Sequence, residues 1–161
     1  MRKFVWVWII VAFMLIAGFA YWKYSYPLSQ GDLLNYVMKE HTNLALHIHT
    51  TLQIEILGEN YTLPENIGVS EYGMRVIHTH KEPNILHIES PYAHQFYLRD
   101  FFKIFGRIFN ETCIFDSCVN SKNELRLYVN GVETHQFENT PLYDGQTIEI
   151  VYTEKKIKSL S

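Results

Sequence analysis

Three histidines near the middle of the chain have the residue type and spacing of metal ligands. In the alternation of a β-strand, His78 and His80 share one face, and their neighbours point to the other. Residues 81–84 form a turn, and His87 follows on the next strand. If the strands are antiparallel, residue 80 lies opposite 85 and His78 opposite His87, with Cβ atoms roughly 5 Å apart. Imidazoles at that distance can share one metal ion.

An earlier segment repeats this pattern. His47 and His49 share a face with the polar positions 51, 53 and 55. The other face is aliphatic, with Leu46, Ile48, Leu52, Ile54 and Ile56. The two segments are expected to lie in one sheet, which places five histidines on the sheet face away from the core.

These positions predict a metal site. The candidate ligands are His47, His49, His78, His80, His87 and Glu89, with Glu55 as another source of oxygen. The favoured set is His78, His80 and His87 with at least one of His47 and His49. Imidazole ligands suit zinc or copper(II), and affinity rises toward copper along the divalent series. A copper or zinc ion is the expected cofactor, and a carrier or accessory protein the expected function.

Other functions fit the same residues. An exposed strand face can carry histidines without binding anything, and crowded imidazoles can act as a pH sensor that loosens as pH falls through roughly 6 to 7. A small metalloenzyme needs a metal ion held by three histidines, an open coordination position on that ion for water, and a base such as Glu89 or Glu55. The sequence contains no H-E-x-x-H motif, nucleophile elbow or phosphate loop, which disfavours an enzyme. A metal-free accessory subunit of a membrane complex is a further alternative.

Composition narrows the classes of partner. The chain has 161 residues and a net charge of −3, with lysine and arginine scattered along it. This balance gives no basic face for nucleic acid. The count of 8 histidines is the feature of the composition that points to a function, since imidazole both titrates near neutrality and binds metals. Three of them, His41, His94 and His135, fall outside the pattern and are expected on the surface.

The N-terminal segment predicts a membrane anchor. Arg2 and Lys3 precede an uncharged run over residues 4–22, about 19 residues, which comes close to spanning a hydrocarbon core of roughly 30 Å. The anchor would contact the lipid bilayer and allow a membrane-protein partner. The basic residues before it would keep the N-terminus in the cytoplasm and place the rest of the chain outside the cell membrane. A cleaved secretory signal is the alternative, because Gly18 and Ala20 offer small residues for cleavage.

The expected organisation has three parts: an anchor or signal over 1–26, a connector with a short helix over 27–43, and an extracytoplasmic domain over 44–161. Within the connector, Asp32 is expected to cap a helix over residues 33–40. In the domain, the periodicity predicts strands near 44–57, 124–132 and 146–152 and an amphipathic helix over 98–105 that ends at Gly106.

Cys113 and Cys118 are close in sequence. In an oxidising compartment they are expected to form a disulfide that closes a small loop. In a reducing compartment they would be thiols or soft metal ligands.

The order of strands and helix resembles the β-grasp fold. We therefore expect an α+β, β-grasp-like mixed sheet with one packed helix and an extra hairpin, after a single N-terminal transmembrane helix. The motifs are also similar to those of poorly characterised membrane-anchored or secreted microbial proteins with paired H-x-H motifs. The matching pieces are His47-Ile48-His49, Pro64 to Gly68, His78-Thr79-His80, His87-Ile88-Glu89-Ser90 and Leu98-Arg99-Asp100-Phe101-Phe102. This resemblance supports grouping the histidines and implies no particular activity.

Overall fold

The computed structural model describes residues 2–25 and 29–155. The chain divides into two compact units, Met1–Leu33 and Leu34–Ser161. Helix α1 (Arg2–Ser25) lies in the first unit, and the short helix α2 (Gln30–Asn35) crosses the boundary between the units. All candidate metal ligands lie in the second unit.

The prediction of a transmembrane anchor over residues 4–22 is wrong. Crossing a bilayer requires about 20 consecutive, mainly apolar residues in one helix. No helix among the described residues combines that length with the necessary hydropathy. The fold class is corrected by removing the transmembrane helix, and the predicted single-pass membrane localisation is corrected with it. The predicted bilayer contact and membrane-protein partner stay predictions.

The predicted connector helix is also shorter than expected. It was placed over residues 33–40, but α2 ends at Asn35. Ser29 precedes the helix, and its hydroxyl accepts a hydrogen bond from the Asp32 backbone N–H at 3.3 Å. Residues 37–38 then form strand β1, which pairs with the strand over residues 73–75, so backbone pairing with another segment ends the helix.

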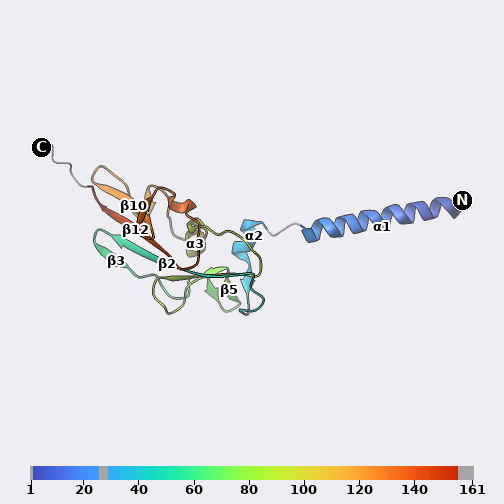
Figure 1. Ribbon diagram of the computed structural model, residues 1–161, viewed down its shortest axis with the longest axis horizontal. Coiled ribbons are helices and arrows are strands. Elements are labelled where there is room, and N and C mark those ends of the chain that lie inside the picture. Colours follow the sequence, from blue (N-terminus) through green and yellow to red (C-terminus); the bar gives the residue numbers. More distant parts are fainter. Residues whose placement is uncertain (1, 26–28, 156–161) are drawn as a thin grey trace. The chain divides into compact units, whose positions relative to one another are not determined.

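One mixed sheet organises the second unit (Figure 1). Its strands are β2 (Leu46–Ile56), β3 (Glu59–Tyr61), β6 (Ile77–His78), β7 (Ile85–Ser90), β10 (Asn123–Val129), β11 (Val132–Thr134) and β12 (Gln146–Glu154). The order is β11-β10-β12-β2-β7-β6, and β3 pairs with the end of β2. β12 runs parallel to β2, whereas β10 and β7, their outer neighbours, run antiparallel. The α+β mixed-sheet part of the prediction is confirmed.

Smaller elements complete the unit. A second sheet has the order β1-β5-β4, and a separate hairpin pairs β8 with β9. Their bounds are β1 (Val37–Met38), β4 (Val69–Ser70), β5 (Gly73–Arg75), β8 (Cys113–Ile114) and β9 (Ser117–Cys118), with a 3-10 turn η1 (Phe137–Asn139) before β12. A tight turn joins β10 to β11, with Asn130 and Gly131 both at positive φ.

Helix α3 (Leu98–Phe105) packs on the apolar face of the sheet (Figure 1). At its start, the Tyr97 backbone N–H donates to the Asp100 carboxylate at 2.9 Å. At its end, Gly106 adopts φ 70°, the left-handed conformation that favours glycine. Phe101 and Phe102 are buried with the even-numbered aliphatic side chains of β2 and β7. Because this core takes one face of each strand, the odd-numbered side chains are directed to the opposite face.

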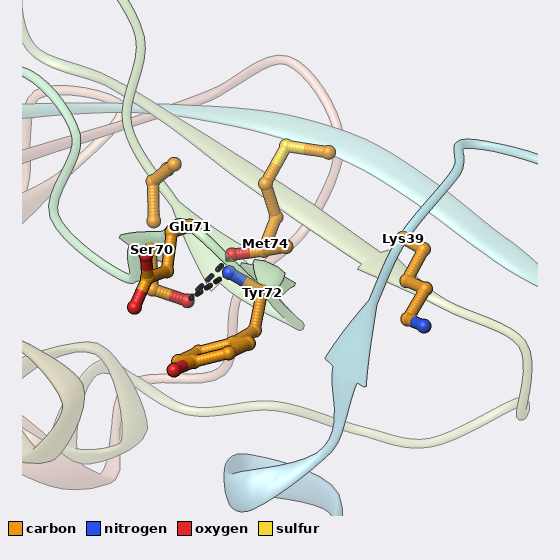
Figure 2. Close-up of a pocket in the computed structure, with 7 residues that line it drawn as sticks. Lys39, Ser70, Glu71, Tyr72 and Met74 are labelled. Carbon is orange, nitrogen blue, oxygen red and sulfur yellow. Dashed lines mark hydrogen bonds between the residues drawn. The ribbon is translucent and has the colours of Figure 1, made fainter.

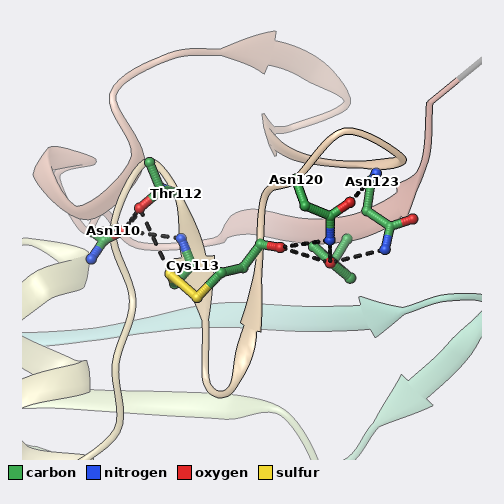
Figure 3. The surroundings of a disulfide bond; sticks show 7 residues. Asn110, Thr112, Cys113, Asn120 and Asn123 are labelled. Atoms are coloured by element: carbon green, nitrogen blue, oxygen red, sulfur yellow. Dashed lines mark hydrogen bonds between the residues drawn. A yellow bond between two sulfur atoms is a disulfide. The ribbon is translucent and has the colours of Figure 1, made fainter.

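Cys113 and Cys118 form a disulfide, as predicted for an oxidising compartment (Figure 3). The bond closes the β8–β9 hairpin. On one side, the Asn110 carboxamide oxygen accepts hydrogen bonds from the backbone N–H groups of Thr112 and Cys113. On the other, the Tyr152 hydroxyl donates to the Cys118 carbonyl at 2.8 Å. The loop is therefore joined to the main sheet through β12.

Replacing both cysteines by serine is expected to lower the free energy of unfolding by about 2 kcal/mol, because a short cross-linked loop restricts the unfolded chain only modestly. Urea denaturation of both proteins measures the difference. Ser121→Ala, an exposed neighbour of the loop, is the control. Equal stability of the double variant and the wild type would contradict this prediction.

Candidate metal centre

The register of the sheet brings histidines from three strands together. His78 on β6 pairs with His87 on β7, as predicted, and His87 in turn pairs with His49 on β2. These residues lie on the face opposite the buried Leu52 and Ile88. A row of three imidazoles therefore crosses adjacent strands.

The predicted hairpin differs in its turn. Pairing between β6 and β7 ends at His78, since the Thr79 backbone N–H donates to the Ile67 carbonyl instead. The Thr79 hydroxyl donates to the Pro64 carbonyl and accepts from the Ile67 N–H. His80 is therefore in the loop, and not opposite residue 85 in a strand.

Three histidines form a group suited to a metal ion. One ring nitrogen from each of His78, His80 and His87 lies within 4.8 Å of the others. The ring centroids of His78 and His80 are 4.8 Å apart, those of His80 and His87 are 4.7 Å apart, and those of His78 and His87 are 5.6 Å apart. The loop position of His80 thus keeps its ring beside the two strand histidines.

The hydrogen bonding of His78 fixes its tautomer. The ring is fully buried, and Nδ1–H donates to the Arg75 carbonyl at 2.9 Å. A carbonyl only accepts, so the proton of a neutral ring is on Nδ1, and Nε2 has a free lone pair. Among the described residues, the Nε2 atoms of His78 and His87 are buried without a hydrogen-bond partner. A neutral imidazole held through Nδ1–H is the form that binds metal ions.

Burial keeps these rings neutral. Desolvation lowers the pKa of His78 to about 4, although the Arg75 hydrogen bond and the Glu89 charge act in the opposite direction. Desolvation, together with the nearby His49 and His80, also lowers the pKa of His87. Both rings are therefore available as metal ligands at neutral pH.

Glu89 has a different place from the one predicted. It is buried, and its carboxylate contacts two histidines, His41 Nδ1 and His47 Nε2, the latter at 3.2 Å. It lies outside the group of three and holds the rings of His41 and His47 in place. His41 was expected to be an unrelated surface residue, yet its ring centroid is 6.1 Å from that of His78. No strand periodicity pointed to His41, because it lies in a loop.

The other predicted ligands lie outside the group of three. His47 and His49 are exposed on β2, and their ring centroids are 4.9 Å apart. The His49 ring centroid is 4.7 Å from that of His87, and the Asp144 carboxylate is 4.0 Å from His49 Nδ1. Glu55 lies six residues beyond His49 on the same strand, about 20 Å away, and does not approach the centre.

A pocket of about 470 Å³ opens beside the group of three. It is lined by Glu65, Asn66, His80, Lys81, Glu82 and His87. A carboxylate oxygen of Glu82 is 3.8 Å from Nε2 of His87. Glu82, which was expected only as a turn residue, thus places a carboxylate beside the group of three.

A larger pocket lies elsewhere. It measures about 570 Å³ and is formed around β4 and β5 by Lys39 and residues 69–74 (Figure 2). Within it, the Tyr72 backbone N–H donates to the Ser70 hydroxyl at 3.3 Å. Its lining contains no histidine or cysteine, so it offers no counterpart to the group of three histidines.

No family model, curated protein or solved structure matches this chain. The resemblance to proteins with paired H-x-H motifs stays a prediction.

Proposed function

We propose that this protein binds one zinc or copper(II) ion through His78, His80 and His87 and serves as a metal carrier or accessory protein. The supporting observation is the convergence of three ring nitrogens within 4.8 Å. Two of these rings have a buried Nε2 with no hydrogen-bond partner among the described residues. An unsatisfied buried polar atom is costly, and a metal–nitrogen bond removes that cost.

The donor set supports these two metals. Imidazole nitrogen binds zinc and copper(II) well, whereas copper(I) favours thiolate and thioether ligands. Both cysteines of the chain are joined in a disulfide, so neither supplies a thiolate. A disulfide persists in an oxidising environment, where copper is mainly the divalent ion.

A carrier fits the surroundings of the centre better than an enzyme does. Three ligands leave one position of a tetrahedral ion open. Glu89, the base considered for an enzyme, is buried and occupied by His41 and His47. The exposed His47 and His49 instead add further imidazoles beside the centre, which suits an ion that is exchanged.

Metal analysis of the full chain tests the function. The purified protein is stripped with a chelator and titrated with zinc and copper(II) against a chromophoric competitor. One equivalent of either ion is expected to bind at pH 7, where the low pKa of His78 keeps its ring neutral. Absence of stoichiometric binding of both ions at this pH would overturn the proposal.

Glu82 is expected to contribute to affinity as the oxygen donor of the open position. Because its side chain is 68% exposed, the carboxylate can reorient toward an ion near His87. Glu82→Gln is expected to weaken zinc binding by about tenfold, within the range seen when a group around a metal site is altered. The same competition titration measures the loss. Glu65→Gln, in the same pocket, is the matched control, and equal affinities of the two variants would exclude this role for Glu82.

A further inference from the structure

Four histidines form a graded series from the surface to the interior. The side chains of His47 and His49 are 51% and 45% exposed, that of His87 is 15% exposed, and His78 is fully buried. Their order in space is the same as their order of burial. An ion bound at the exposed end therefore has imidazoles ahead of it along the way to the buried ligand.

The spacing along this series is short at each step. Ring centroids are 4.9 Å apart from His47 to His49, 4.7 Å from His49 to His87 and 5.6 Å from His87 to His78. The group of three spans the same range. Neighbouring rings of the series are thus as close as rings that can share one ion.

The backbone maintains this spacing. His49 pairs with His87, and His87 with His78, within hydrogen-bonded strands whose other faces are fixed in the core. His47 lies two residues before His49 and is on the same face of β2. The series is therefore held by the sheet and needs no loop movement to form.

Carboxylates lie beside the exposed end. Glu89 contacts His47, and Asp144, which is 69% exposed, accepts a hydrogen bond from the His49 backbone N–H at 2.9 Å. Negative charge at this position attracts a cation and raises its local concentration.

We propose that His49, with His47 at the surface, is the exchange ligand through which the ion enters and leaves the group of three. This inference rests on the metal-binding function proposed above. At each step a metal–nitrogen bond to one neutral imidazole forms as a bond to the previous imidazole breaks. The ion keeps its charge, and the step requires no proton, electron or additional reagent. The ion is held by His49 and His87 together before His49 releases it.

The test is a comparison of rates and affinity in His49→Ala. Zinc uptake and zinc release to a chromophoric chelator are followed by stopped-flow absorbance, and Kd is measured by competition. Both rates are expected to fall by about tenfold, while Kd changes by less than about threefold, because an exchange ligand changes rates without holding the ion at rest. Thr51→Ala, on the same face of β2, and His135→Ala are expected to keep wild-type rates.

Two results would overturn the exchange path. One is wild-type rates in His49→Ala, and the other is a loss of affinity beyond threefold, which makes His49 a resident ligand. In both cases the wild-type protein still binds an ion. Failure of the wild type to bind zinc or copper(II) is a different result, and it overturns the proposed function itself.

Discussion

A protein carrying both His78→Ala and His87→Ala is expected to lose stoichiometric metal binding. Each of these residues supplies a buried Nε2 atom without a hydrogen-bond partner among the described residues, and only His80 of the group of three is left. Altering a group that only supports a ligand costs roughly 10–100-fold in affinity, so losing two direct ligands is expected to cost more than about 1000-fold. Competition titration with zinc and copper(II) measures this loss.

Folding must be separated from binding in this experiment. His78 is fully buried, so alanine leaves a cavity and destabilises the protein. A second variant with glutamine at both positions keeps more of the side-chain volume, and circular dichroism of the metal-free proteins verifies that each variant is folded. His135→Ala, an exposed histidine outside the sheet face, is the control. One tightly bound ion in a folded double variant would contradict the assignment of these ligands.

The metal-free protein is expected to become less stable as the pH falls from 6.5 to 4. Burial lowers the pKa of His78 from 6.5 to about 4. Above pH 6.5 the ring is neutral in both the folded and the unfolded state and adds no pH dependence. Below that pH the unfolded chain takes up the proton first, so stability falls until the folded protein also titrates near pH 4. The shift corresponds to about 3 kcal/mol for His78, and the lowered pKa of His87 acts in the same direction.

Urea denaturation in the presence of a chelator, from pH 4 to pH 8, measures this loss. His78→Gln removes the titrating group, so the difference between wild type and variant isolates its contribution. All other titratable groups of the chain are present in both proteins. His135→Gln is expected to keep the wild-type dependence. Parallel stability curves for wild type and His78→Gln would show that burial of His78 has no such effect.

Much of the histidine face is predictable because β-strand geometry is local. Side chains alternate with a period of two, so apolar residues such as Leu52 and Ile88 determine which side of each strand faces the core. This alternation also determines that His47, His49 and His87 lie on the other side. The pairing of His78 with His87 followed from the turn between their strands, and the disulfide followed from the short separation of the two cysteines.

Local pattern gave the wrong result where a different part of the chain decides the conformation. The apolar N-terminal run suggested a transmembrane anchor, whereas no described helix meets the requirements for one. The helix expected over residues 33–40 ends early because residues 37–38 pair with β5. His80 leaves its strand because Thr79 bonds to Ile67, a segment more than ten residues earlier.

The sequence by itself determined that this chain forms an α+β sheet domain with several histidines on one sheet face, because side-chain alternation depends only on neighbouring residues. Only the tertiary structure decided which of them meet. Pairing of β2 with β7 places His49 beside His87, and a loop brings His41 to the buried Glu89. These contacts join residues distant in the chain, and they depend on strand register and core packing, which no local spacing specifies.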